Sequence, residues 1–196
     1  MLDSAGFLTE HMVVHILAMN VAAPLAIFGW RQLAGRAPGA IANARWIGPA
    51  SALQILLLWG WHLPAPMAFA YAVPAGEALM HGTLFAAALW FWNTIINDAE
   101  ASRWRSLGAL LITGKLFCLL GVLLTFAPRA LYLRAAELCL GGPVAAEALV
   151  PDQQLAGLIM LVACPLVYVL GGVIIAARWL NEIDKRPTSH IAESMG

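Results

Sequence analysis

The sequence predicts an all-α integral membrane protein, a bundle of about five transmembrane helices. Hydrophobic residues make up 61% of the 196 residues and charged residues only 11%, whereas soluble domains carry roughly a quarter charged residues. The apolar residues fall into runs close to the ~20 residues that cross a bilayer. We therefore expect a single transmembrane domain over residues 1–196, embedded in the lipid bilayer.

The first two expected helices cover residues 11–28 and 46–63. The first is an apolar run that opens on His11 and His15. Glycine and proline recur in the connection that follows it, which is typical of a loop. The second run ends at the sequence Trp61-His62-Leu63-Pro64. Residues 64–74 contain three prolines and are expected to form a loop.

The other three expected helices cover residues 75–97, 107–127 and 155–180. A short charged turn separates the first two of these, and a long loop over residues 128–154 precedes the last. Residues 181–196 are charged and are expected to form a tail. Lys115 lies near the middle of the 107–127 run. It either snorkels toward the interface or pairs with a buried acceptor.

The basic residues predict how the bundle is oriented. The connection between the first two helices contains Arg31, Arg36 and Arg45 and no acidic residue, and the tail carries Lys185 and Arg186. Cytoplasmic loops are enriched in Lys and Arg. With five spans, the C-terminal tail is then cytoplasmic and the N-terminus periplasmic. The formal net charge is +0, and nothing indicates a nucleic-acid partner.

Four histidines are expected in one layer on the periplasmic side. His11 and His15 are four residues apart, which places both imidazoles on one helix face. His62 closes the second helix, and His81 lies near the start of the third, so both share this layer in the predicted topology. Ionisable groups inside a membrane segment are costly and suggest a function.

This layer is the candidate metal site. We expect His11, His15, His62 and His81 as ligands, with Met12, Met80, Glu77 and Asp152 as additional ligands or supporting groups. Imidazole and thioether together suit copper, especially Cu(I). The cysteines have no CxxC spacing, so the sequence indicates neither a disulfide framework nor a thiolate site.

Simpler interpretations exist for the same residues. A histidine at a helix end often bonds only to backbone or water. Methionines fill irregular gaps in a core. Glu77 and Asp152 are also placed to cap helix N-termini, where an anion is favoured.

An ordered set of motifs resembles the CtaG family of cytochrome c oxidase assembly factors. It consists of His11-Met12-Val13-Val14-His15, Trp61-His62-Leu63-Pro64, Phe91-Trp92-Asn93, and residues 124–132 and 152–160. The resemblance covers most of residues 8–180. It implies a bacterial inner-membrane protein that assembles a haem-copper oxidase, with delivery or insertion of copper as the suspected role. The implied partners are oxidase subunits or a periplasmic copper donor.

Three functions remain open at this stage. The first is a copper-binding assembly factor, a metallochaperone that acts by ligand exchange. The second is a b-type cytochrome in which two histidines from different helices, such as His15 and His81, ligate haem. The third is a scaffold or small transporter without a metal, and a homo-oligomer is compatible with each. No nucleophile–base arrangement or HExxH motif indicates an enzyme.

Overall fold

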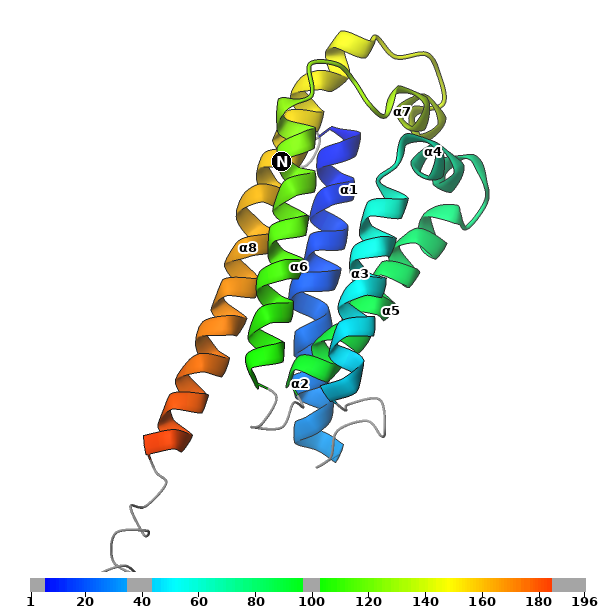
Figure 1. Cartoon of the computed structure of the whole chain (residues 1–196). Helices are drawn as coiled ribbons and strands as arrows, with labels where there is room; N and C mark the ends of the chain where they lie inside the picture. The colour runs from blue at the N-terminus through cyan, green and yellow to red at the C-terminus, as the bar shows by residue number, and fades with distance from the viewer. Residues whose placement is uncertain (1–5, 35–43, 97–102, 185–196) are drawn as a thin grey trace, which may run out of the picture.

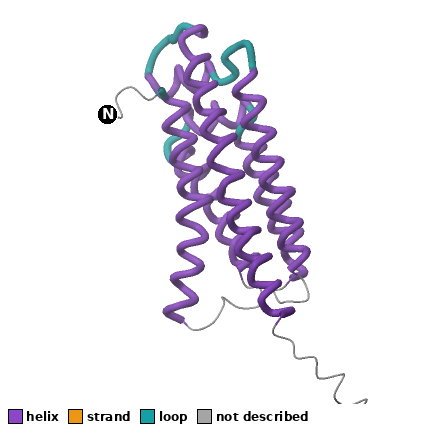
Figure 2. Tube along the Cα trace, turned by 90° about the vertical axis from the view of Figure 1, so that its left-hand side faces the viewer, coloured by secondary structure: helices purple, strands orange, loops and turns teal. Residues whose placement is uncertain are grey.

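The computed structural model describes residues 6–34, 44–96 and 103–184, and within these ranges every regular element is helical. Figure 1 shows the long helices side by side in one bundle, with α4 and α7 lying across one end. The described loops gather at that same end in Figure 2. The elements are α1 (Phe7–Ile16), η1 (Leu17–Ala22), α2 (Ala23–Ala34), η3 (Ala44–Trp46), α3 (Ile47–Trp61), α4 (Pro64–Ala72), α5 (Gly76–Ile96), α6 (Arg103–Phe126), α7 (Leu133–Leu140) and α8 (Ala146–Asp184).

Among the described residues, four helices are long and apolar enough to cross a membrane, and a fifth candidate span is broken. The four are Phe7–Leu33, Gly76–Ile96, Arg103–Phe126 and Ala146–Asp184; the fifth joins Ala44–Trp61 to Pro64–Ala72 through a bend of 76°. The predicted all-helical membrane fold with about five spans is therefore confirmed.

The loop predicted over residues 64–74 is wrong, because Pro64–Ala72 forms α4. Pro64 opens this helix. A proline is well tolerated in a first turn, where its missing N–H would have no helical partner. The same kind of error affects the long loop predicted over 128–154, which contains α7 and the first turns of α8.

The first and last predicted helices are longer in the structure, and α6 begins at Arg103 rather than at residue 107. The first begins at Phe7 rather than at residue 11 and continues to Ala34, and α8 spans 146–184 rather than 155–180. Residues 181–184 of the predicted tail thus belong to α8. The rest of that tail, including His190, lies outside the described residues.

Glycines allow α6 and α8 to pack closely. A Cβ on Gly121 would lie 3.0 Å from the Gly157 carbonyl oxygen, and one on Gly157 would lie 2.6 Å from Thr125 Oγ1. Small residues let helix backbones approach in lipid, where close packing replaces the hydrophobic effect as the force that joins them. This contact fixes α8 along the side of the bundle.

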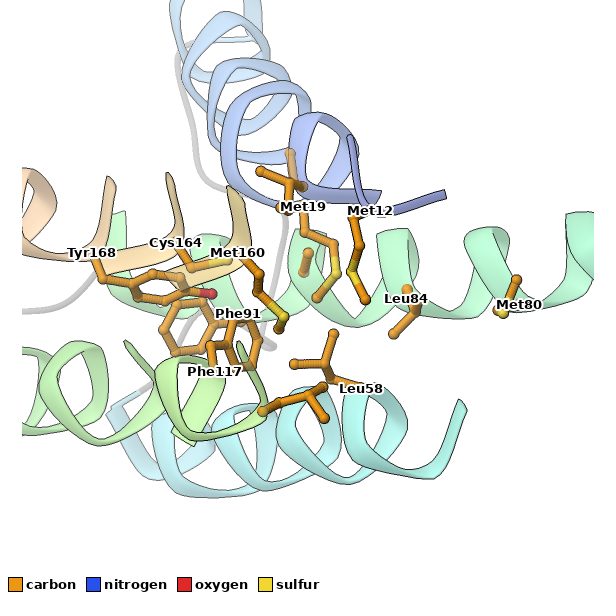
Figure 3. Close-up of a cluster of buried hydrophobic side chains, with 14 of the residues drawn as sticks. Met12, Met19, Leu58, Met80, Leu84, Phe91, Phe117, Met160, Cys164 and Tyr168 are labelled. Carbon is orange, nitrogen blue, oxygen red and sulfur yellow. The ribbon is translucent and has the colours of Figure 1, made fainter. Parts of the chain in front are cut away.

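Aromatic rings and methionines fill part of the core between the helices (Figure 3). The Tyr168 ring packs against Phe117 and Phe91, with centroids 5.5 Å and 5.8 Å away. Its hydroxyl accepts a hydrogen bond of 2.7 Å from Gln54 Nε2. The core thus includes a few polar groups that are paired across helices.

The first span contains a π-helical segment, η1, which begins two residues after His15. The Ala23 N–H donates to the Ala18 carbonyl, five residues earlier. In this register the Met19 carbonyl would pair with residue 24, but Pro24 has no N–H. The indole Nε1–H of Trp92 on α5 donates to Met19 O instead, at 2.9 Å. This bond joins α5 to the first span at Met19, one helical turn after His15.

Candidate metal centre

The start of α1 is held by a carboxylate from α8. Asp152 accepts hydrogen bonds from the Leu8 N–H at 2.8 Å, the Thr9 N–H at 3.1 Å and the Thr9 hydroxyl at 2.6 Å. A Cβ on Gly6 would collide with this carboxylate. N–H groups at a helix start have no partner within the helix, and an anion there is favoured by the helix dipole. Asp152 therefore acts as a cap supplied by another helix, and its carboxylate is engaged at α1 rather than at an imidazole.

His11 and His15 lie on the buried face of the helix that Asp152 anchors. Their exposed fractions are 4% and 1%, and their ring centroids are 4.9 Å apart. The pair begins one turn inside α1 instead of at its first residue, so the Asp152 bonds hold the backbone just before it.

His62 lies at the break between α3 and α4. Its Nδ1 is 2.7 Å from the Leu58 carbonyl oxygen. A carbonyl oxygen only accepts, so Nδ1 carries the proton and the Nε2 lone pair is left for another partner. The Tyr132 hydroxyl donates to the His62 carbonyl at 2.6 Å. The first bond fixes the orientation of the imidazole ring, and the second holds the main chain of His62 in place.

His81 is arranged in the same way on α5. Its Nδ1 is 3.0 Å from the Glu77 carbonyl oxygen, so Nδ1 is protonated and Nε2 carries the lone pair. The Glu77 side chain is exposed. Glu77 thus supports His81 through its main chain, whereas the sequence pointed to its carboxylate.

His11 has a tyrosine as its partner. The Tyr71 hydroxyl on α4 lies 3.2 Å from His11 Nδ1. The sequence interpretation missed Tyr71 because it placed residues 64–74 in a loop. The helical spacing of the buried Met67 and Ala70 just before it was the available signal.

Gln153 stabilises the segment that leads to Tyr132. Its Oε1 accepts from the Leu131 N–H at 2.8 Å, and its Nε2 donates to the carbonyls of Leu124 and Arg129, both at 3.3 Å. Gln153 is 2% exposed. Two consecutive residues of α8 therefore support the site from two directions: Asp152 holds α1, and Gln153 holds the chain that carries Tyr132.

The four predicted histidines come together in space. The His11 ring centroid lies 5.6 Å from that of His62 and 5.2 Å from that of His81, and His15 lies 5.1 Å from His62. One ligand atom from each of His11, His15 and His62 falls within 4.8 Å of the others. Three separate segments of the chain thus supply one cluster, which we call the histidine cluster (His11, His15, His62 and His81).

The Nε2 atoms of the histidine cluster are buried and have no hydrogen-bond partner among the described residues. The same holds for His15 Nδ1. Buried polar atoms are nearly always paired, so a group of five unpaired nitrogens needs an explanation. Metal-ligating histidines characteristically bond to a carbonyl or another acceptor through one nitrogen and leave the other for the metal. The residues present fit a metal ion.

The predicted sulfur ligands belong to the apolar core. Met12 and Met80 are each 0% exposed and lie in the hydrophobic cluster. Figure 3 shows Met12 beside Met19 and Met80 farther along α5. Their role as copper ligands stays a prediction.

The chain was compared with known proteins. The family model for the cytochrome c oxidase caa3 assembly factor matches residues 4–182, nearly the whole chain. The comparisons with curated proteins and with solved structures gave no match. The family match covers every helix that builds the histidine cluster.

Proposed function

The chain belongs to the family of cytochrome c oxidase caa3 assembly factors, and from this premise we propose that it binds copper in the histidine cluster and supplies it to the oxidase. Copper is the cargo and not a resident cofactor. It stays Cu(I) throughout, and each imidazole that leaves is replaced by a ligand of the acceptor. The role is therefore transfer by ligand exchange and not catalysis.

The observation that carries this proposal is the set of four orphaned Nε2 atoms. At least two of them, on His62 and His81, are lone-pair donors by virtue of their Nδ1 bonds. Four neutral imidazoles supply no negative charge to balance a buried ion. A monovalent ion is therefore less costly to bury there than a divalent one. Imidazole suits copper and zinc, whereas oxygen ligands suit magnesium and calcium.

The haem alternative is less well supported. Haem would ligate two histidines on opposite faces of a flat macrocycle, and His15 and His81 have centroids 6.5 Å apart. The His11 ring is 4.9 Å from His15 and 5.2 Å from His81. It therefore lies in the space between them that the macrocycle would need.

We place the histidine cluster on the periplasmic side of a bacterial inner membrane. The opposite end of the bundle carries Arg31 in the last turn of α2, Arg103 at the start of α6 and Arg178 near the end of α8. This distribution matches the enrichment of basic residues at cytoplasmic ends. A periplasmic copper donor and an oxidase copper centre would then reach the cluster from the same side.

The test is copper binding by the purified protein under anaerobic conditions. We expect about one Cu(I) per chain, and at least ~10-fold weaker binding, measured against a chromogenic chelator, in His15→Ala and His62→Ala. His190→Ala is the matched control, because this histidine lies outside the cluster-forming segments. A Soret band in the purified protein would favour haem.

A metal-free scaffold gives a different result. In that case neither copper nor haem copurifies, and oxidase maturation in cells is the same with His15→Ala as with the wild type. That outcome would refute the copper proposal while leaving the family assignment intact.

A further inference from the structure

Lys115 is a charged side chain on the lipid-facing surface at the middle of a membrane span. It is exposed, twelve residues after Arg103 and eleven before Phe126 in α6. At 1.5 Å per residue, the ends of the helix are about 18 Å and 16 Å away along the axis. A lysine side chain extends only about 6 Å, so its ammonium does not reach either interface by snorkelling.

No described residue compensates this charge. The ion pairs in the described ranges are Arg103–Glu182 and Arg134–Glu137, and Lys115 takes part in no hydrogen bond there. A lone charge in the hydrocarbon region is expensive, and such residues normally pair with another group. The partner of Lys115 must then come from outside the described chain.

Lys115 lies in a groove between α6 and α8, which run side by side in Figure 1. The groove has a volume of about 380 Å³ and is lined by Leu111, Gly114, Pro165, Val169 and Gly172 together with Lys115. Leu111 and Val169 are 61% and 60% exposed. Small residues on its floor and apolar side chains on its walls suit the close approach of another helix.

We propose that this groove docks a transmembrane helix of a different protein that carries one Asp or Glu at mid-membrane depth. The carboxylate pairs with Lys115, and the apolar face of the helix fills the groove. The family assignment makes an oxidase subunit the natural class of partner. The proposal does not depend on copper binding by the histidines.

A second copy of this chain lacks the required group. Within the described spans, the acidic residues other than Asp152 lie near helix ends: Glu10, Glu77 and Glu147 in first turns, and Glu182 and Asp184 in the last turn of α8. Asp152 is engaged at the start of α1. A lipid phosphate also fails, because it stays at the interface about 15 Å from mid-membrane.

The experiment is photo-crosslinking in native membranes. A photoreactive benzoylphenylalanine replaces Leu111, one turn before Lys115 on the groove wall, and the crosslinked peptide is sequenced by mass spectrometry. We expect a peptide from another protein with a carboxylate midway along an apolar segment. The adduct should fall by about tenfold or more in Lys115→Met and persist in Lys115→Arg, which keeps the charge. A photoreactive residue at Leu123, which does not line the groove, serves as the position control.

Four results would overturn the proposal: adducts only with lipid, adducts with a second copy of the chain, a partner segment without a carboxylate, or a yield that Lys115→Met leaves unchanged. The thermal midpoint and copper content of Lys115→Met are measured in parallel. Values equal to the wild type show that the variant is folded, and they separate failure of the docking proposal from failure of the copper proposal.

Discussion

Replacing Asp152 by Asn should loosen the first helix and the histidines that it carries. Asp152 accepts three hydrogen bonds from Leu8 and Thr9, at 2.6–3.1 Å. The amide keeps one accepting oxygen but turns an NH2 group toward backbone donors. It also removes the negative charge from the N-terminus of α1.

The magnitude follows from the bonds that are lost. A hydrogen bond to a charged group is worth about 1.5–3 kcal/mol, and a charge at a helix end adds about 0.3–1 kcal/mol. We therefore expect a loss of about 2–4 kcal/mol in the free energy of unfolding. For a chain of this length each kcal/mol lowers the unfolding midpoint by about 2–4 °C, which gives a shift of roughly 5–15 °C.

Thr9→Val is the matched control, because it removes the hydroxyl bond and leaves both backbone bonds to Asp152. It should cost only about 1 kcal/mol. Both variants are compared with the wild type by thermal unfolding in one detergent, followed by tryptophan fluorescence. A midpoint of Asp152→Asn within about 1 °C of the wild type would show that this carboxylate does not anchor α1. An equal loss in Thr9→Val would contradict the contribution of the two backbone bonds and the charge.

Three further outcomes are expected. Trp92→Phe should lower the free energy of unfolding by about 1–3 kcal/mol, since the buried Met19 carbonyl loses its donor. The control Trp90→Phe should lower it less, because the Trp90 indole N–H has no partner in the described structure. Equal losses for the two variants in thermal unfolding would contradict the Trp92–Met19 bond as a stabilising contact. Gly157→Ala should destabilise by about 1–3 kcal/mol through overpacking, while Gly108→Ala, with nothing within 4 Å of its new Cβ, should be neutral or slightly stabilising. Cys139 is exposed on α7, and its pKa is raised by partial burial and nearby acidic residues. Since the thiolate is the reactive form, a membrane-impermeant maleimide should label it slowly at neutral pH and faster in alkali, and only from the periplasmic side.

Much of the fold is predictable because lipid leaves few choices. Apolar runs of sufficient length must satisfy their backbone groups as helices, so all five apolar runs are helical, and the predicted bounds of the three middle spans lie within four residues of those observed. The convergence of the four histidines followed from topology alone, since three of the helices present them at the same end of the bundle. Their function as metal ligands stays a prediction, which the copper-binding measurement tests.

The short helices and the supporting contacts were not predictable in this way. Residues 64–72 and 133–140 are too short or too polar to stand out, and α4 has prolines that suggested a loop. The bonds of Asp152 to Leu8 and Thr9 join residues more than 140 positions apart. No local sequence pattern encodes such a pairing. Asp152 was therefore predicted to lie beside the imidazoles, whereas in the structure it binds the N-terminus of α1.

The hydrogen bonds between Asp152 and the start of α1 also affect the order in which the histidine cluster forms during synthesis. The α1 segment is synthesised before α8, and the Asp152 carboxylate that anchors it lies 144 residues after Leu8. Until α8 is inserted, the histidine pair sits on a helix whose first N–H groups lack their acceptor. A chain truncated before Asp152 therefore carries both histidines on a helix that lacks these hydrogen bonds, and we expect the histidine cluster to become ordered only after α8 is inserted.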